Sequence, residues 1–348
     1  MPWDEGLVNS LVYDRPDPAE GRVTSYVKAI NEALALALER DASVFVLGQG
    51  VDDPSAMFGT TKGLRERFGS HRVFDTPLSE EAMMGVAAGA AMNGMRPVYL
   101  HNRPDFVLLA FNQLVTHAAK FHYMDNGQTT VPMVVWAAIG RGWGSGAQHS
   151  QAIQGILLGV PGLKIIMPST PHDAKGLLLS AILDNNPVCV FEHRWLMKKD
   201  GVVPEGFYRV PLGKAICRRQ GRDVTIVGAS HAIELGMQAA SQLATEGIDA
   251  EVIDLRTIKP LDEAMILESL RKTGRIVAVD TAWMKGGVCA EIGCLAAERG
   301  YADLKAPVAR VGLPDVPTPA GYALEQYFYP KAERIAHAAR TVVRWGHP

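Results

Sequence analysis

Residues 81–100, EAMMGVAAGAAMNGMRPVYL, contain the pattern from which the fold follows. The small and apolar side chains of 81–93 predict a helix, and residues 97–100 read as a short apolar strand after it. The same order occurs upstream, where residues 26–38 are apolar at helical spacing and Val44–Leu47 forms another apolar run. Strands without polar alternation are covered on both faces, which is typical of parallel sheets between helices.

This alternation continues along the chain. Further helices are predicted over 108–123, 152–158 and 174–183, and further strands over 133–138, 164–167 and 188–192. Residues 197–213, MKKDGVVPEGFYRVPLG, break the rhythm with charges, glycines and prolines. A second alternation follows, with strands over 223–229, 250–254, 275–280 and 308–311 and helices over 233–246, 263–273 and 290–299. The prediction is an α/β protein with an N-terminal extension (1–23), a parallel-sheet domain (24–196), a linker (197–213) and a smaller α/β domain (214–348).

Composition excludes several classes of protein. The 348 residues carry a formal net charge of −2 without a block of like charge, so no nucleic-acid or membrane surface is expected. The acidic N-terminus has no apolar core of a signal peptide, and no run of 18 apolar residues occurs, so we expect a cytoplasmic protein. The G-x-x-x-x-G-K-[ST] motif is missing, and the glycines at 140, 142, 144 and 146 do not form G-x-G-x-x-G.

Several motifs together resemble the β subunit of the E1 component of 2-oxo acid dehydrogenases, which are transketolase-like enzymes that use thiamine diphosphate. The motifs lie in order between about Thr24 and Pro330 and include 29–34 (AINEAL), 75–80 (DTPLSE), 85–97 (GVAAGAAMNGMRP), 149–151 (HSQ), 168–171 (PSTP), 251–256 (EVIDLR) and 260–262 (PLD). The resemblance implies a pyrimidine-binding domain followed by a transketolase-type C-terminal domain.

The resemblance assigns the main catalytic role to Glu80. The family's glutamate at this place hydrogen-bonds N1′ of the aminopyrimidine and favours the 4′-imino tautomer, which removes the proton from C2 of the thiazolium. Such general acid–base work requires a carboxyl group in a poorly solvated pocket. From the residues alone, Glu80 and Glu81 could both be acids at a helix N-terminus, and Glu81 keeps that interpretation.

His149 follows the glycine-rich loop, whose backbone can approach a ligand closely. The family's histidine lies near the substrate, where it orients or transfers a proton, so we assign His149 as the second catalytic residue. The alternative is an ordinary loop or capping residue. The resemblance also implies cofactor-binding positions beside the pyrimidine for Leu78, Phe106 and Asn102, although the two apolar residues could equally be plain core.

The sequence departs from the family at the expected substrate pocket. The usual Gly-Glu-Asp-Val is Gly48-Gln49-Gly50-Val51, and the usual Glu-Ile-Gln-Phe-x-Asp-Phe is residues 100–106, LHNRPDF. We place His101, Asn102, Arg103 and Trp143 in the pocket, with Arg141 on the same loop as Trp143. These side chains predict a polar substrate, hydroxylated or phosphorylated, instead of a branched-chain 2-oxo acid. Alternatively, Arg103 forms a salt bridge to a partner chain.

The cofactor cannot be held by this chain alone. A diphosphate needs a metal and backbone donors, and the family's Gly-Asp-Gly motif for both is absent. The resemblance therefore implies an α-type subunit that holds the diphosphate and Mg²⁺, an α₂β₂ assembly with a β–β dimer, and possible transfer to a lipoyl acyltransferase (E2). Ala181, Asp184 and Asn186 resemble a backbone site for K⁺ in some relatives, with a helix-end turn as the alternative.

The predicted function is that of the β subunit of a thiamine-diphosphate enzyme that decarboxylates a 2-oxo acid and transfers the acyl or aldehyde unit. Two alternatives stay open. One is a two-component transketolase or carboligase without a lipoyl partner. The other is a non-catalytic scaffold, which would have no use for a carboxylate in an apolar pocket.

Overall fold

The computed structural model describes residues 21–53, 56–141 and 144–346, which form two compact units. The first unit contains residues up to Ile139 together with Val160–Leu212. The second contains Gly140–Gly159 together with the residues from Gly213 onward. The segment 140–159, which lies within the first domain along the sequence, is therefore part of the second unit.

The first unit is built on a parallel sheet with the strand order β6-β7-β5-β4-β2-β3. Its strands are β2 (Val44–Gly48), β3 (Val73–Asp75), β4 (Arg96–His101), β5 (Val134–Ile139), β6 (Lys164–Ile166) and β7 (Val188–His193). Its helices are α2 (Tyr26–Arg40), α3 (Leu64–Phe68), α4 (Glu80–Met92), α5 (Phe121–Met124) and α7 (Pro171–Leu183). The predicted parallel α/β fold is confirmed.

Helices bury both faces of this sheet. On one face α2 and α7 pack together over alternate strand residues such as Val46, Val98 and Trp136, which form one core cluster. The alternate positions, such as Leu47, are also buried, and α4 packs against β4 from that side. Since residues i and i+2 of a strand share a face, burial of both sets explains why the strands lack polar alternation.

The helix predicted over 108–123 is replaced by three shorter pieces. A 3-10 segment, η2 (Pro104–Ala110), leads into a π-helical segment, η3 (Asn112–Ala118), and then into α5. Buried positions are three residues apart in η2 (Val107, Ala110) and four apart in η3 (Leu114, Ala118). The change of winding keeps one stripe of side chains on the buried side.

Residues 197–213 contain a strand that their composition did not indicate. Strand β8 (Asp200–Pro204) pairs antiparallel with β1 (Gly21–Ser25), and 3-10 segments lie at η1 (Ala56–Gly59) and η4 (Arg194–Leu196). Residues up to Leu212 belong to the first unit by their contacts. Glycine and proline at positions 201 and 204, with an acid at 200, hide this short strand from a reading based on apolar runs.

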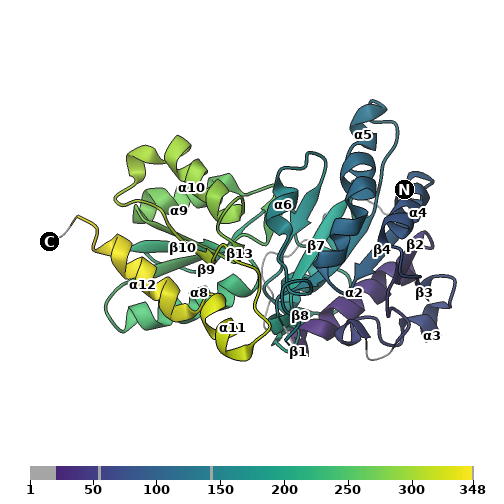
Figure 1. Ribbon diagram of the computed structural model, residues 1–348, viewed down its shortest axis with the longest axis horizontal. Helices are drawn as coiled ribbons and strands as arrows, with labels where there is room; N and C mark the ends of the chain where they lie inside the picture. Colours follow the sequence, from purple (N-terminus) through teal and green to yellow (C-terminus); the bar gives the residue numbers. More distant parts are fainter. Residues whose placement is uncertain (1–20, 54–55, 142–143, 347–348) are drawn as a thin grey trace. The chain divides into compact units, whose positions relative to one another are not determined.

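The second unit has a five-stranded sheet of order β14-β13-β10-β11-β9, in which only β9 is antiparallel to its neighbour. Its strands are β9 (Ile216–Arg219), β10 (Val224–Gly228), β11 (Ala250–Asp254), β13 (Ile276–Trp283) and β14 (Ala309–Leu313), and β12 (Thr257–Lys259) follows β11 along the chain. Helices α8 (His231–Ala244) and α12 (Ala332–Val343) pack together, as do α9 (Glu263–Thr273) and α10 (Val288–Arg299), on opposite sides of the sheet (Figure 1). The remaining elements are α6 (Gln154–Leu158), η5 (Tyr301–Asp303) and α11 (Tyr322–Phe328).

Candidate active site

The polar residues of the first unit gather where β2, β3 and β4 end. Carboxyl ends of parallel strands meet at one edge of the sheet, which is where α/β proteins commonly bind ligands. Glu80 begins α4 just after β3 and is only 8% exposed. The Nε2 atom of Gln49, which follows β2, donates to Oε1 of Glu80 at 3.2 Å. A buried carboxyl group with a neutral amide donor thus lies at this edge.

The backbone around Gln49 is fixed by close contacts. Gly48 has a φ of 151°, and a Cβ atom there would lie 2.3 Å from the carbonyl oxygen of Leu100. The amide of Thr76 donates to the carbonyl of Gly48 at 2.9 Å, and the amide of Val51 donates to Oδ1 of Asp75 at 2.7 Å. These bonds tie the loop after β2 to the end of β3, and they explain why Gln49 reaches Glu80.

Tyr99 and His101, two titratable residues of β4 at this edge, are uncharged. Burial raises the pKa of Tyr99 to about 12, and the negative charge of Glu80 adds to this shift. The ring of His101 lies 4.2 Å from that of Tyr99, and burial lowers the pKa of His101 to about 3, so its imidazole is neutral. His101 is 3% exposed, and its Nε2 atom has no hydrogen-bond partner. It can serve as a neutral hydrogen-bonding group but not as a cation.

The other predicted residues of this edge differ in exposure. Leu78 is 82% exposed although it is two residues from Glu80, Asn102 is exposed, and Phe106 is half-buried. Arg103 is 7% exposed at the start of η2. The structure therefore brings buried charge and exposed apolar surface together at one edge of the sheet.

Arg194 is a member of this edge that the sequence analysis missed. It follows β7, and its guanidinium lies 4.9 Å from the ring centre of Phe58. Burial lowers the pKa of Arg194 to about 10, and the positive charge of Arg103 lowers it further. Two guanidinium groups that repel each other are thus held at the carboxyl end of the sheet. Its position directly after a buried strand was the signal that could have identified Arg194.

His149 lies in the second unit, so the two predicted catalytic residues belong to different units. It is exposed, and its amide donates to the carbonyl of Gly146 at 3.4 Å. Gly144 and Gly146 both have a φ of 66°, and a Cβ atom at either would come within 3.2 Å of Ala320. Glycine is needed at these positions for the turn and for the close approach. Trp143, predicted in the substrate pocket, lies outside the described residues.

Arg141, at the start of the same loop, has a defined partner within the second unit. Its Nη1 atom lies 2.7 Å from Oε2 of Glu325, which is 3% exposed. The guanidinium also lies 5.8 Å and 5.9 Å from the ring centres of Tyr322 and Tyr329. Glu325 is 184 residues away along the chain, and no sequence motif pointed to it.

The predicted K⁺ site is already close to a cation. Arg96 donates to the backbone carbonyls of Ile182 at 2.9 Å and Asp184 at 3.1 Å, and also to the side chain of Asn185. The carbonyl of Ala181 accepts the amide of Asp184 at 3.3 Å. Among the described residues, no group of three or more His, Cys, Asp or Glu side chains could hold a metal ion.

Within the same residues, no helix has the length and apolarity needed to cross a membrane.

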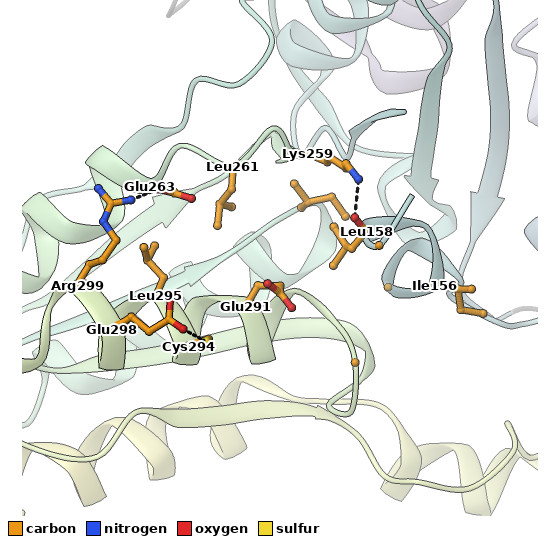
Figure 2. A pocket seen from close by; sticks show the side chains of 14 residues that line it. Ile156, Leu158, Lys259, Leu261, Glu263, Glu291, Cys294, Leu295, Glu298 and Arg299 are labelled. Carbon is orange, nitrogen blue, oxygen red and sulfur yellow. Dashed lines mark hydrogen bonds and ion pairs between the residues drawn. The ribbon is translucent and has the colours of Figure 1, made fainter. Parts of the chain in front are cut away.

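A pocket of about 560 Å³ lies within the second unit, next to α6 (Figure 2). Its walls come from α6, β12, α9 and α10, and they combine leucines with the carboxyl groups of Glu291 and Glu298. Lys259 donates to the carbonyl of Leu158 at 2.5 Å across one wall (Figure 2). The helix after the His149 loop is thus tied to β12 beside this pocket.

Comparisons with known proteins agree with this architecture. Residues 23–199 match the family model "Transketolase, pyrimidine binding domain", and residues 213–335 match "Transketolase, C-terminal domain". A solved structure titled "Split gene transketolase, inactive beta4 tetramer" has the same fold, with a TM-score of 0.74 and 23% identity over 92% of this chain and 98% of that one. The fold and the order of domains define a transketolase-like protein.

Two relatives show to which family of transketolase-like proteins the chain belongs. The chain is 41% identical over 325 residues to the 2-oxoisovalerate dehydrogenase subunit beta of Bacillus subtilis (strain 168), covering 93% of this chain and 99% of the relative. It is also 41% identical over 326 residues to the acetoin:2,6-dichlorophenolindophenol oxidoreductase subunit beta of the same organism, covering 90% and 95%. The protein belongs to the family of E1 β subunits of thiamine-diphosphate-dependent 2-oxo acid dehydrogenases.

Proposed function

We propose that this chain supplies the pyrimidine side of a shared thiamine-diphosphate site, in which the carboxyl group of Glu80 hydrogen-bonds N1′ of the aminopyrimidine. The observation that carries the proposal is a carboxyl group 8% exposed at the carboxyl edge of a parallel sheet, with an amide as its partner. Burying a carboxylate is costly, and a ligand that hydrogen-bonds it offsets this cost.

Thiamine diphosphate, when bound, supplies a thiazolium carbon that adds to the carbonyl of a 2-oxo acid. The residues of this chain fit the pyrimidine end of such a group. Leu78 and Phe106 offer apolar contact to an aromatic ring, Asn102 offers a hydrogen-bonding side chain, and Glu80 exchanges a proton with the ring nitrogen. Gln49 orients the carboxyl group of Glu80 without adding a charge, because its amide donates to Oε1.

For His149 we propose a role on the substrate side, where its imidazole orients the substrate or transfers a proton. The side chain is exposed on a loop shaped by two glycines with positive φ. An imidazole can both donate and accept a proton, which suits proton transfer.

The substrate that we propose is polar and carries an anionic group besides its 2-oxo acid function. The support is the pair Arg103 and Arg194, whose guanidinium groups repel each other at the same sheet edge as Glu80. An anion between or beside two guanidiniums relieves that repulsion and accepts several hydrogen bonds. The neutral His101 and the exposed Asn102 add hydrogen-bonding groups at the same edge of the sheet.

For the assembly, we propose an α-type subunit that holds the diphosphate and Mg²⁺, within an α₂β₂ tetramer that contains a β–β contact. Exposed apolar residues support a partner surface on the first unit. Leu78, Val86 of α4 and Leu109 of η2 are 82%, 56% and 61% exposed, and α4 and η2 contact each other. Transfer of the acyl unit to a lipoyl acyltransferase completes the proposal. The turn at Ala181, Asp184 and Asn186 fits K⁺ poorly, because Arg96 already donates to the Asp184 carbonyl.

The test compares Glu80→Gln with Glu81→Gln in the complex reconstituted with its α-type partner. Both are charge-neutralising changes on the first turn of α4, but Glu81 is exposed. With cofactor and Mg²⁺ saturating, Glu80→Gln should lower kcat by roughly 10²–10⁴, the usual contribution of an acid–base group, while Glu81→Gln stays near the wild-type rate. Equal rates for the two variants would mean that Glu80 is only a helix N-terminal acid.

A further inference from the structure

The segment 140–159 carries His149 and is fastened to the C-terminal unit at both of its ends. Along the sequence it lies inside the stretch that matches the pyrimidine-binding domain, yet it groups into one compact unit with the residues from Gly213 onward. Its two anchors join residues 184 and 126 positions apart. Both anchors hold the segment that carries His149.

The first anchor is the ion pair between Arg141 and Glu325. The carboxyl group of Glu325 is 3% exposed, so it depends on the guanidinium 2.7 Å away for its compensation. The aromatic rings of Tyr322 and Tyr329 lie beside that guanidinium and restrict its position. Ala320, just before α11, contacts Gly144 and Gly146. Helix α11 and Ala320, two residues before it, therefore form the support of the His149 loop.

The second anchor lies after His149. Gln154, at the start of α6, donates to Oδ1 of Asp280 in β13 at 3.1 Å, and these residues are 0% and 3% exposed. Gly155 packs so closely that a Cβ atom would lie 3.1 Å from the carbonyl oxygen of Gly286. With Lys259 bound to the carbonyl of Leu158 (Figure 2), α6 has little freedom to move on this unit.

We propose that Glu325 and Asp280 are positioning residues, which act on the reaction through Arg141 and Gln154 by fixing the loop that presents His149. The proposal rests on the proposed function of His149. His149 itself is exposed and lies between the two anchors, so fixing the segment 140–159 fixes the backbone that carries its side chain. A displacement of about 1 Å at a reacting group can cost a factor of 10² in rate.

The experiment measures kcat and KM of the reconstituted complex for Glu325→Gln in the wild-type and in the His149→Ala background. If Glu325 acts through His149, the change should lower kcat roughly tenfold with KM little changed in the wild-type background, and by less than about twofold where His149 is absent. Gln154→Met, which removes the other anchor's donor, should show the same dependence on background. It keeps the test available should Glu325→Gln fold poorly.

The matched control is Asp254→Asn. Asp254 is 0% exposed and forms an ion pair with Arg218 at 2.8 Å in the same unit. This ion pair includes no residue of 140–159. Hydrogen exchange of the amides of 144–150 gives a readout that does not depend on activity. It should become faster in Glu325→Gln and stay unchanged in Asp254→Asn, even if both lower the melting temperature.

The outcomes separate the two ideas. An equal loss of kcat in both backgrounds, or unchanged exchange in 144–150, overturns the positioning role while the function of His149 stands. If His149→Ala alone leaves the rate unaltered, the proposed function of His149 fails and the positioning role fails with it. Faster exchange together with a loss confined to the wild-type background supports both.

Discussion

Replacing Gln49 by glutamate should place a second carboxyl group against Glu80 and change the pH dependence of the protein. Nε2 of Gln49 lies 3.2 Å from Oε1 of Glu80. Two negative charges at that separation repel by about 5 kcal/mol at an effective dielectric constant of 20. Because Gln49 is only half-buried, solvent reduces this to about 2 kcal/mol, which corresponds to about 1.5 pH units. Glutamate is the residue that the family pattern usually has here, so the variant should fold.

The sign of the effect follows from linkage. In the folded variant, the two carboxyl groups keep one shared proton up to a higher pH than a separate carboxyl group in the unfolded chain keeps its own proton. The stability of the variant is therefore complete below the ordinary glutamate range and is lost as the pH rises through the raised value. Between pH 4 and pH 7 the free energy of unfolding should fall by about 2 kcal/mol relative to the wild type.

The assay is denaturant unfolding of both proteins from pH 4 to pH 8, with the pH–rate profile of the reconstituted complex beside it. The acid limb of that profile should move by about 1 to 2 pH units to higher pH. Gln49→Met is the matched control, since it removes the amide without adding a charge. If the glutamate and methionine variants show the same pH dependence, the two side chains are not in contact and the geometry of the site is misread.

Three further predictions concern the substrate pocket, the partner and the core. In a substrate panel, Arg103→Met should reduce kcat/KM for an anionic substrate at least tenfold relative to kcat/KM for branched-chain 2-oxo acids, as expected for a lost charge-assisted hydrogen bond. The control Arg222→Met changes an exposed arginine and should leave this ratio unchanged. Calorimetry of the isolated chain should show only weak binding of thiamine diphosphate with Mg²⁺, and tight binding would contradict a shared site. Burial raises the pKa of Glu192 to about 8, so its stabilising contribution is complete below the ordinary pKa and is lost as the pH rises to 8. Between pH 5 and 7 the free energy of unfolding should therefore fall with rising pH less steeply in Glu192→Gln than in the wild type, by about 1 kcal/mol per pH unit.

The alternation of helices and strands could be predicted because buried parallel strands are apolar on both faces. Strand β11 and helix α9 have the predicted bounds, 250–254 and 263–273. Residues 332–343 were left without an element, although Ile335, Ala339 and Val342 recur at helical spacing in α12. That helix was available from the sequence. The pairing of β1 with β8 was not, because it joins residues of mixed polarity that lie 175 or more positions apart.

The residues of the site also divide into those that the sequence could indicate and those that it could not. Glu80 was singled out because a motif marks it, and its burial agrees with a carboxyl group kept from water, while its catalytic role stays a prediction. Gln49 was noticed only as a departure from the family pattern, and its bond to Glu80 depends on how β2 and β3 end side by side. Arg194 and Glu325 belong to no motif, and their partners lie in distant parts of the sequence. Side chains whose role is set by long-range contacts leave no local pattern.

The two catalytic candidates also depend on different cores, because Glu80 starts a helix of the first unit and His149 lies on a segment of the second. Asp280 belongs to β13, whose Val279 packs in a core cluster with Ile335 of α12. Truncating Ile335 to alanine leaves a cavity that costs about 2–5 kcal/mol. Such a change should loosen the support of the His149 loop and leave the bond between Gln49 and Glu80 intact. The matching truncation of Leu34, in the core cluster of the first unit, should act on Glu80 instead. Domain boundaries drawn along the sequence assign both candidates to one domain and predict no such difference.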